Sequence, residues 1–216
     1  MCSSDLYMFH TYCLPQAIGN TQVTYNFNQY IRTIPECWTR TLPYTNENGT
    51  ISPYVKSNQN DPNDGILVFT GKANQIISTG KYIENMSSIE VEFSVFRESA
   101  SESGQLELGV VSDPRNPSSF AVVHDITPLI TQDRQLERLN LSLANAPSGM
   151  HYIAFRQTVS SSDDDGQYGI DDLSIYAAPT CRKPEISTVS IEPTEDPTAQ
   201  TDRKSTRLNS SHVKLS

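Results

Sequence analysis

The chain has 216 residues, with 16 basic and 25 acidic side chains and a formal net charge of −9 at pH 7. Such an acidic chain repels phosphate backbones and has no Lys/Arg cluster, so nucleic acid is excluded as a partner. No apolar run reaches the roughly 20 residues of a membrane-spanning helix, so we expect no membrane insertion in this chain. Few charged residues and 13 prolines are typical of an all-β protein with long turns.

Both ends of the chain resemble translated sequencing adapters. Residues 202–212 read Asp-Arg-Lys-Ser-Thr-Arg-Leu-Asn-Ser-Ser-His, the in-frame translation of a common adapter, and residues 1–6 are similar to the opposite adapter strand. We therefore interpret residues 1–6 and 202–216 as artefacts and set them aside before reasoning about the fold. The alternative for the second segment is a disordered basic tail. We expect residues 7–201 to be a fragment of a longer protein.

The first part of the chain predicts a linker, a strand and long loops. Residues 7–20 indicate the end of a preceding module and a linker that contains Pro15. Val23, Tyr25 and Phe27 then alternate with polar residues, as in a half-buried first strand. A turn follows at residues 35–38 (Pro-Glu-Cys-Trp). Residues 43–65 are rich in Asn, Pro, Asp and Gly, which predicts long loops with little regular structure.

The remainder predicts a series of short strands. Residues 66–69 form an apolar run, which is typical of a strand buried on both faces. The clearest alternation covers residues 89–95, with Ile, Val, Phe and Val on one face and polar side chains on the other. Further strands are expected at residues 106–110, 120–126, 139–143, 150–159 and 168–176. About ten short strands separated by turns predict an all-β fold, an antiparallel β-sandwich of jelly-roll type.

The cysteines favour a setting outside the cytoplasm. Without the adapter-like residues, Cys13, Cys37 and Cys181 remain. A Cys13–Cys37 disulfide would join the linker to the first strands, and the third cysteine would have lost its partner with the missing sequence. Three reduced, buried thiols are the alternative. No C-x-x-C pair is present, so a zinc or thioredoxin-type site is not supported.

These features, in this order, resemble the MAM-like jelly-roll domains of bacterial surface proteins, the group that includes cleaved-adhesin and "choice-of-anchor" domains. The matching segments are Phe27 and residues 35–38, 107–114, 152–156 and 170–175. The resemblance covers most of residues 21–179. It also implies a following fibronectin type III-like module that begins in residues 180–201. For residues 21–179 it implies an extracellular binding or spacer module without catalysis.

Two adjacent acids in the last predicted strand require an explanation. Strict alternation places Asp171 with Leu173 and Ile175 on the core face, so its carboxylate should be partly desolvated and should need a partner. The resemblance implies a structural calcium held by acids near the first strand, in the following loop and in this final Asp-Asp. Asn28 and Asp64 stand at the first two places, although Asn28 departs from the expected acid. The alternatives are a salt bridge to an arginine and backbone N–H donors.

Two other acidic patterns have simpler explanations. Asp163, Asp164 and Asp165 precede Gly166 but lack the alternation and the final Glu of an EF-hand, so we interpret them as a solvated hairpin tip. Glu90 and Glu92 are similar to the acid pair of concanavalin-like glycosidases, but the pattern does not continue after them. A position on the solvent-facing side of a strand is therefore favoured for Glu90 and Glu92.

Tyrosines in predicted loops are the candidates for ligand contact. Tyr44, Tyr54 and Tyr82 could contact a glycan, because loops on a rigid scaffold carry binding function. Trp38 could stack on a sugar, but a lone Trp beside a cysteine favours a core position.

We therefore predict a non-catalytic module for extracellular adhesion or for binding carbohydrate or protein. It would belong to a multidomain secreted or cell-surface protein, with an extracellular glycan or protein as its partner. The alternatives are a structural spacer and an accessory domain of a secreted peptidase or glycosidase whose catalytic domain lies elsewhere.

Overall fold

The computed structural model describes residues 13–19, 21–58, 61–98, 104–159 and 167–179. These residues belong to one compact unit, Met1–Pro179. Several predicted segments lie outside the described residues: the adapter-like ends, residues 7–12, residues 163–166 with their three aspartates, and the segment after residue 179 with Cys181. The predictions of a preceding module and of a fibronectin-like module therefore remain predictions.

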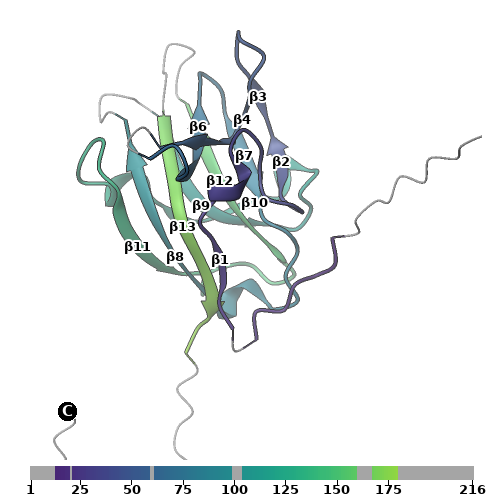
Figure 1. Ribbon diagram of the computed structural model, residues 1–216. Coiled ribbons are helices and arrows are strands. Elements are labelled where there is room, and N and C mark those ends of the chain that lie inside the picture. Colours follow the sequence, from purple (N-terminus) through teal and green to yellow (C-terminus); the bar gives the residue numbers. More distant parts are fainter. Residues whose placement is uncertain (1–12, 20, 59–60, 99–103, 160–166, 180–216) are drawn as a thin grey trace, which may run out of the picture. The chain divides into compact units, whose positions relative to one another are not determined.

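The larger sheet has β13 at its centre (Figure 1). Its strands lie in the order β11 (Glu137–Ser142), β8 (Ile89–Arg97), β13 (Gln167–Ala177), β6 (Gly65–Thr70) and β5 (Tyr54–Ser57). The short strand β1 (Val23–Tyr25) also pairs with β13, and all of these pairings are antiparallel. On one side, β13 therefore pairs first with β6, as far as Ile170, and then with β1, from Leu173.

The smaller sheet and a separate hairpin complete the strands. The smaller sheet has the order β10 (Phe120–Asp125), β9 (Gln105–Val111), β12 (Tyr152–Thr158), β7 (Gln75–Ser78) and β2 (Thr39–Leu42). Strands β3 (Tyr44–Thr45) and β4 (Ile51–Ser52) pair with each other. The prediction that residues 43–65 have little regular structure is thus wrong, because β3, β4 and β5 lie there. These strands are too short, and too polar, for alternation to reveal them.

Short 3-10 helices connect some of the strands: η1 (Asn28–Tyr30), η2 (Met86–Ser88), η3 (Pro117–Ser119) and η4 (Thr127–Leu129). In the described part of the chain there is no α-helix. No helix found there is long and apolar enough to cross a membrane.

The two sheets enclose one hydrophobic core. The predicted face of β8, formed by Ile89, Val91, Phe93 and Val95, is fully buried. The Phe93 ring meets that of Phe155 on β12 edge to face, with ring centroids 5.3 Å apart, so the core spans both sheets. Trp38 is also buried and packs edge to face on Tyr25 and Phe27. The protein is an antiparallel β-sandwich of the predicted class.

A β-bulge in β13 overturns the predicted faces of that strand as far as Asp171, whereas Leu173 and Ile175 lie in the core as predicted. The register with β8 shifts between Asp171 and Ser174, and Asp172 has a left-handed backbone with φ 49°. One extra residue in the strand reverses the alternation, so Ile170 and Leu173 both face the core. Asp171 pairs with Ser94 and faces away from the core, contrary to the sequence-based expectation.

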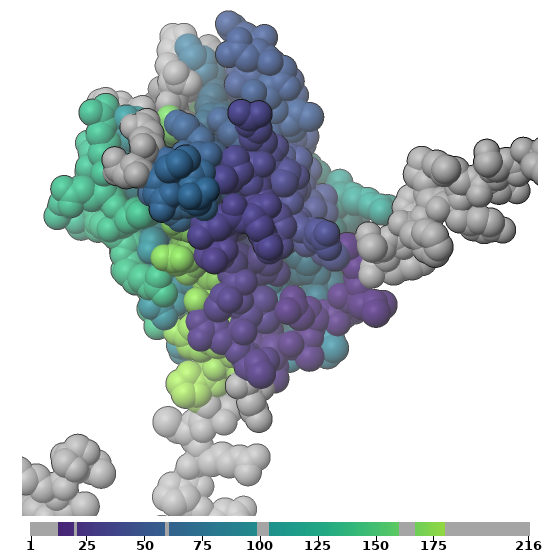
Figure 2. All heavy atoms as spheres, in the orientation of Figure 1, coloured from purple at the N-terminus to yellow at the C-terminus, as the bar shows by residue number. Residues whose placement is uncertain are grey.

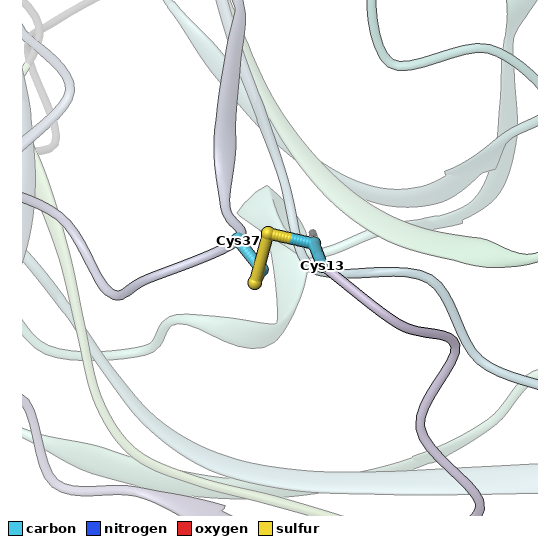
Figure 3. The surroundings of a disulfide bond; sticks show 2 residues. All are labelled: Cys13 and Cys37. Carbon is cyan, nitrogen blue, oxygen red and sulfur yellow. A yellow bond between two sulfur atoms is a disulfide. The ribbon is translucent and has the colours of Figure 1, made fainter. Parts of the chain in front are cut away.

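The entry segment is tied to the sandwich in several ways. Cys13 and Cys37 form a disulfide, with their Cα atoms 5.4 Å apart (Figure 3). Gln16 forms a parallel bridge with Tyr82, and the Ile18 and Gly19 amides donate to the Glu84 carboxylate at 2.9 and 3.0 Å. The fully buried Ile18 side chain belongs to the core.

Candidate functional site

A groove lies on the outer face of the larger sheet, with a volume of about 560 Å³. Ile66 and Val68 of β6 and Phe96 of β8 supply apolar side chains, and Gln167 of β13 lies between these strands. We call this hollow, with the walls described below, the sheet groove. Its volume falls in the range of small-ligand sites.

Phe96 packs closely on the neighbouring strand in the sheet groove because that strand carries a glycine. Gly169 pairs with Phe96, and a Cβ atom at Gly169 would collide with the Phe96 ring and approach Ile66. The ring therefore packs directly on the Gly169 backbone. One sequence signal points to this position, since Phe96 stands where alternation predicts a polar side chain after Glu90, Glu92 and Ser94.

The walls of the sheet groove are largely polar, with Leu136 as an exposed apolar member. Lys56, Ser57 and Asn58 at the end of β5 form one wall. On the other side Arg134 pairs with Glu98, with Nε and Oε1 2.8 Å apart. An apolar floor between hydrogen-bonding walls is the arrangement of a ligand site that fixes orientation through a few polar contacts.

A second set of polar groups lies where β13 changes its partner from β6 to β1. The structure brings together here two of the predicted metal ligands, Asp64 and Asp171, which interact electrostatically. Asn28, the third, is linked to this place because its Oδ1 accepts a 2.8 Å hydrogen bond from the amide of Gly65. We call Asn28, Asp64 and Asp171 the strand junction.

The Asp171 carboxylate is buried at the strand junction, with 4% of the residue exposed. Desolvation, together with the nearby carboxylates of Asp172 and Asp64, raises the pKa of Asp171 to about 7. The opposing contributions come from the amide of Asp172, which donates to Asp171 Oδ1 at 2.7 Å, and from Arg138. A backbone N–H donor, one of the alternatives expected from the sequence, is therefore present at Asp171.

Arg138 forms ion pairs with two acids close to Asp171. Its Nε is 2.7 Å from Glu92 Oε1, and its Nη1 is 3.8 Å from Asp172 Oδ2. A hard cation such as calcium prefers oxygen ligands. The strand junction offers three side chains that carry them: the carboxylates of Asp64 and Asp171 and the amide oxygen of Asn28. Among the described residues no three His, Cys, Asp or Glu side chains gather in one group, so backbone oxygens or water would have to complete such a shell.

The three predicted ligand-binding tyrosines do not form one surface. Tyr82 is fully buried in the core, because its backbone pairs with Gln16 and donates to the carbonyl oxygen of His151. Its assignment to a ligand-binding loop is therefore wrong. The half-buried Tyr44 ring packs on Gly71, and Tyr54 lines a pocket at the start of β5.

Glu90 and Glu92 lie on the outer face of β8, as predicted. Both are half-buried, and Glu92 is engaged by Arg138. Glu92 is thus an ion-pair partner within the sheet surface, and the sheet groove is lined by different residues.

Comparison with known proteins supports the fold. The chain is similar to the K1 cleaved adhesin domain of Lys-gingipain from Porphyromonas gingivalis W83, with TM-score 0.50 and 16% identity over 74% of this chain and 99% of that domain. It is also similar to the K3 domain of the same protein, with TM-score 0.51 and 14% identity over 72% and 98% of the two chains. For the K2 domain of Lys-gingipain the TM-score is 0.53, with 13% identity over 72% of this chain and 99% of that domain.

No protein-family model matches the sequence. No curated protein matches it either. At identities of 13–16% the structural likeness establishes a β-sandwich of the adhesin-domain type, and it is evidence for the fold alone.

Proposed function

We propose that this protein is a non-catalytic extracellular adhesion module that binds carbohydrate in the sheet groove. The observation that carries the proposal is the half-buried Phe96 ring, which packs on Gly169 between two largely polar walls. A flat aromatic face can cover the apolar face of a sugar, while Asn58, Glu98 and Gln167 can hydrogen-bond its hydroxyl groups.

The fold and the disulfide support the extracellular part of the proposal. Three cleaved adhesin domains share the fold, and a Cys13–Cys37 disulfide is typical of proteins outside the cytoplasm. A protein ligand in the same groove is the second candidate. The open hollow and polar walls favour a sugar, since protein-binding patches have broader apolar centres.

A glycan array probed with the whole chain tests the proposal. We expect binding by the wild type, and a loss of about tenfold or more in affinity for Phe96→Ala, because central aromatic contacts contribute more than 1 kcal/mol. Phe120→Ala is the matched control. Phe120 is a half-buried aromatic residue on the other sheet, where Arg156 lies 4.3 Å from its ring centroid.

Two results would overturn the sugar proposal. Equal losses in the two variants would mean that the sheet groove is not the binding site. No binding across a broad array would favour a spacer, or an accessory domain of a secreted enzyme.

We further propose that the strand junction holds a structural calcium ion. Asp171 is a buried carboxylate beside Asp64, and bringing two like charges together is unfavourable unless a cation or a proton compensates them. Calcium would stabilise the point along β13 at which its pairing partner changes from β6 to β1.

Calcium removal tests this second proposal independently of sugar binding. EDTA should lower the Tm of the wild type by several degrees, because a ligand bound to the native state stabilises it. The Asp171→Asn variant should lose most of that response. Asp113→Asn, a change at an exposed acid between β9 and β10, should keep it. A wild-type Tm that EDTA leaves unchanged, with calcium removal verified by metal analysis, would overturn the proposal.

A further inference from the structure

A second hollow of about 530 Å³ lies between the β3–β4 hairpin and the start of β5. Arg32, Arg40 and Tyr54 line it, together with Thr33, Thr50 and Ile51. We call it the arginine pocket. The hairpin that forms one wall projects from the top of the molecule in the space-filling view (Figure 2).

Both arginines are held in place by the backbone around them. Arg40 donates from Nε to the carbonyl oxygen of Pro53 at 2.7 Å, which fixes the plane of its guanidinium group. Arg32 has a left-handed backbone with φ 71°, and its amide donates to the carbonyl oxygen of Val55 at 2.7 Å. Its neighbour Thr33 accepts from the Val55 amide in return, so the segment is anchored to β5.

The arginine pocket gathers positive charge without compensation. Its lining contains no carboxylate, although the chain has 25 acidic residues and a net charge of −9. Among ion pairs within the described ranges, none includes Arg32 or Arg40. Burial lowers the pKa of Arg40, the expected direction for a cation that loses water. Two cations that line one pocket repel each other, and an anion bound between them would remove that repulsion.

We propose that the arginine pocket binds a carboxylate or sulfate group carried by a sugar. A guanidinium group presents paired N–H donors that match the two oxygens of such a group. The hydroxyl groups of Thr33 and Thr50 can add neutral donors, and the half-buried Tyr54 ring offers a face for the sugar.

The charge of the whole protein restricts the ligand further. A long polyanion would extend beyond the pocket and be repelled by a chain with a net charge of −9. The pocket is therefore suited to one acidic sugar unit at the end of a glycan. This site is separate from the sheet groove, and its ligand does not depend on what the sheet groove binds.

Titration of the whole chain with galactose, galacturonic acid and galactose 6-sulfate, followed by NMR, tests the proposal. The three sugars differ in one substituent, so carboxylate and sulfate are tested separately against the neutral sugar. We expect at least one acidic sugar to bind about tenfold or more tightly than galactose. The resonances of Arg32, Arg40 and Tyr54 should shift during the titration.

Arg32→Gln is the decisive variant, because it removes one charge and leaves the backbone hydrogen bonds of residue 32 intact. It should lose most of the preference for the acidic sugar, and Arg115→Gln, at an exposed arginine between β9 and β10, should retain it. Arg40→Gln should behave like Arg32→Gln if it folds. Equal binding of galactose, equal losses in Arg32→Gln and Arg115→Gln, or tighter binding of an acidic peptide would each overturn the proposal.

Discussion

Phe93 and Phe96 lie three positions apart on β8, with their side chains on opposite faces of the larger sheet. Phe93 is fully buried and meets Phe155 across the sandwich, so it contributes to stability. Phe96 is half-buried over Gly169 on the outer face, where an aromatic ring has no core to fill. The same residue type is thus assigned to packing at one position and to binding at the other.

Phe93→Ala should lower the free energy of unfolding by about 3–5 kcal/mol, since it removes a ring and leaves a cavity in a core that spans both sheets. Phe96→Ala should lower it much less, because the ring keeps contact with water in the native state. Urea denaturation of both variants measures the difference. A loss for Phe96→Ala as large as that for Phe93→Ala would mean that the outer ring is a structural element.

Asp171 gives the calcium-free protein a defined pH dependence. Its pKa is raised to about 7 in the folded state, whereas an unfolded Asp has a pKa of about 3.9, so folding favours its protonated form. Its contribution to stability is therefore fully present below about pH 4 and is lost as the pH rises through about 7. In EDTA, Asp171→Asn should match the wild type near pH 4 and exceed it in Tm above pH 7. The same Tm difference at both pH values would contradict this assignment.

At the level of elements, the alternation of apolar and polar residues predicted those strands that have one face in the core and the other in solvent over several residues. Strand β8 is the clearest case, since each apolar position from Ile89 to Val95 is buried. Strand β13 was predicted with the wrong faces as far as Asp171 and with the right faces at Leu173 and Ile175, because a bulge inserts one residue between them and alternation contains no mark of it. Strands β2 and β7 were missed, since four residues do not define a period.

The candidate sites were predicted only in part, because they depend on pairings between segments that are distant in the sequence. Asp64 and Asp171 lie near each other as the resemblance implied, although Asp171 reaches that place from the outer face. The sheet groove depends on the register that sets Phe96 against Gly169, which is a pairing between distant segments. Tyr82 was assigned to a loop surface because the pairing with Gln16 that buries it is equally distant in the sequence.

The Cys13–Cys37 disulfide joins the entry segment to the turn before β2. The two residues are 24 positions apart, so the cross-link restricts the unfolded chain and should contribute about 3 kcal/mol to stability. Cys13→Ser combined with Cys37→Ser should lower the midpoint of urea unfolding accordingly. The wild type in reductant should unfold at the same midpoint as the double variant. A midpoint equal to that of the oxidised wild type would show that the cross-link does not contribute.

On the scale of the whole molecule, the order of strands along the chain differs from their order in space. Strand β13 is the last described strand, yet it lies at the centre of the larger sheet and pairs with β8, β6 and β1. The first strand, β1, finds its partner about 150 residues later in the chain. Such non-local pairing means that the larger sheet cannot be complete until almost the whole domain is present.

Two truncated chains test this dependence. A chain that ends at residue 166 lacks β13, so β1 loses its partner and the core loses Tyr168, Ile170, Leu173 and Ile175. It should show no cooperative thermal transition by circular dichroism, because the loss of these four buried side chains exceeds the usual stability of a domain. A chain that ends at residue 179 keeps every described strand and the whole compact unit, and its Tm should lie within a few degrees of the full chain. Cooperative unfolding of the shorter chain would mean that the two sheets hold together without their central strand.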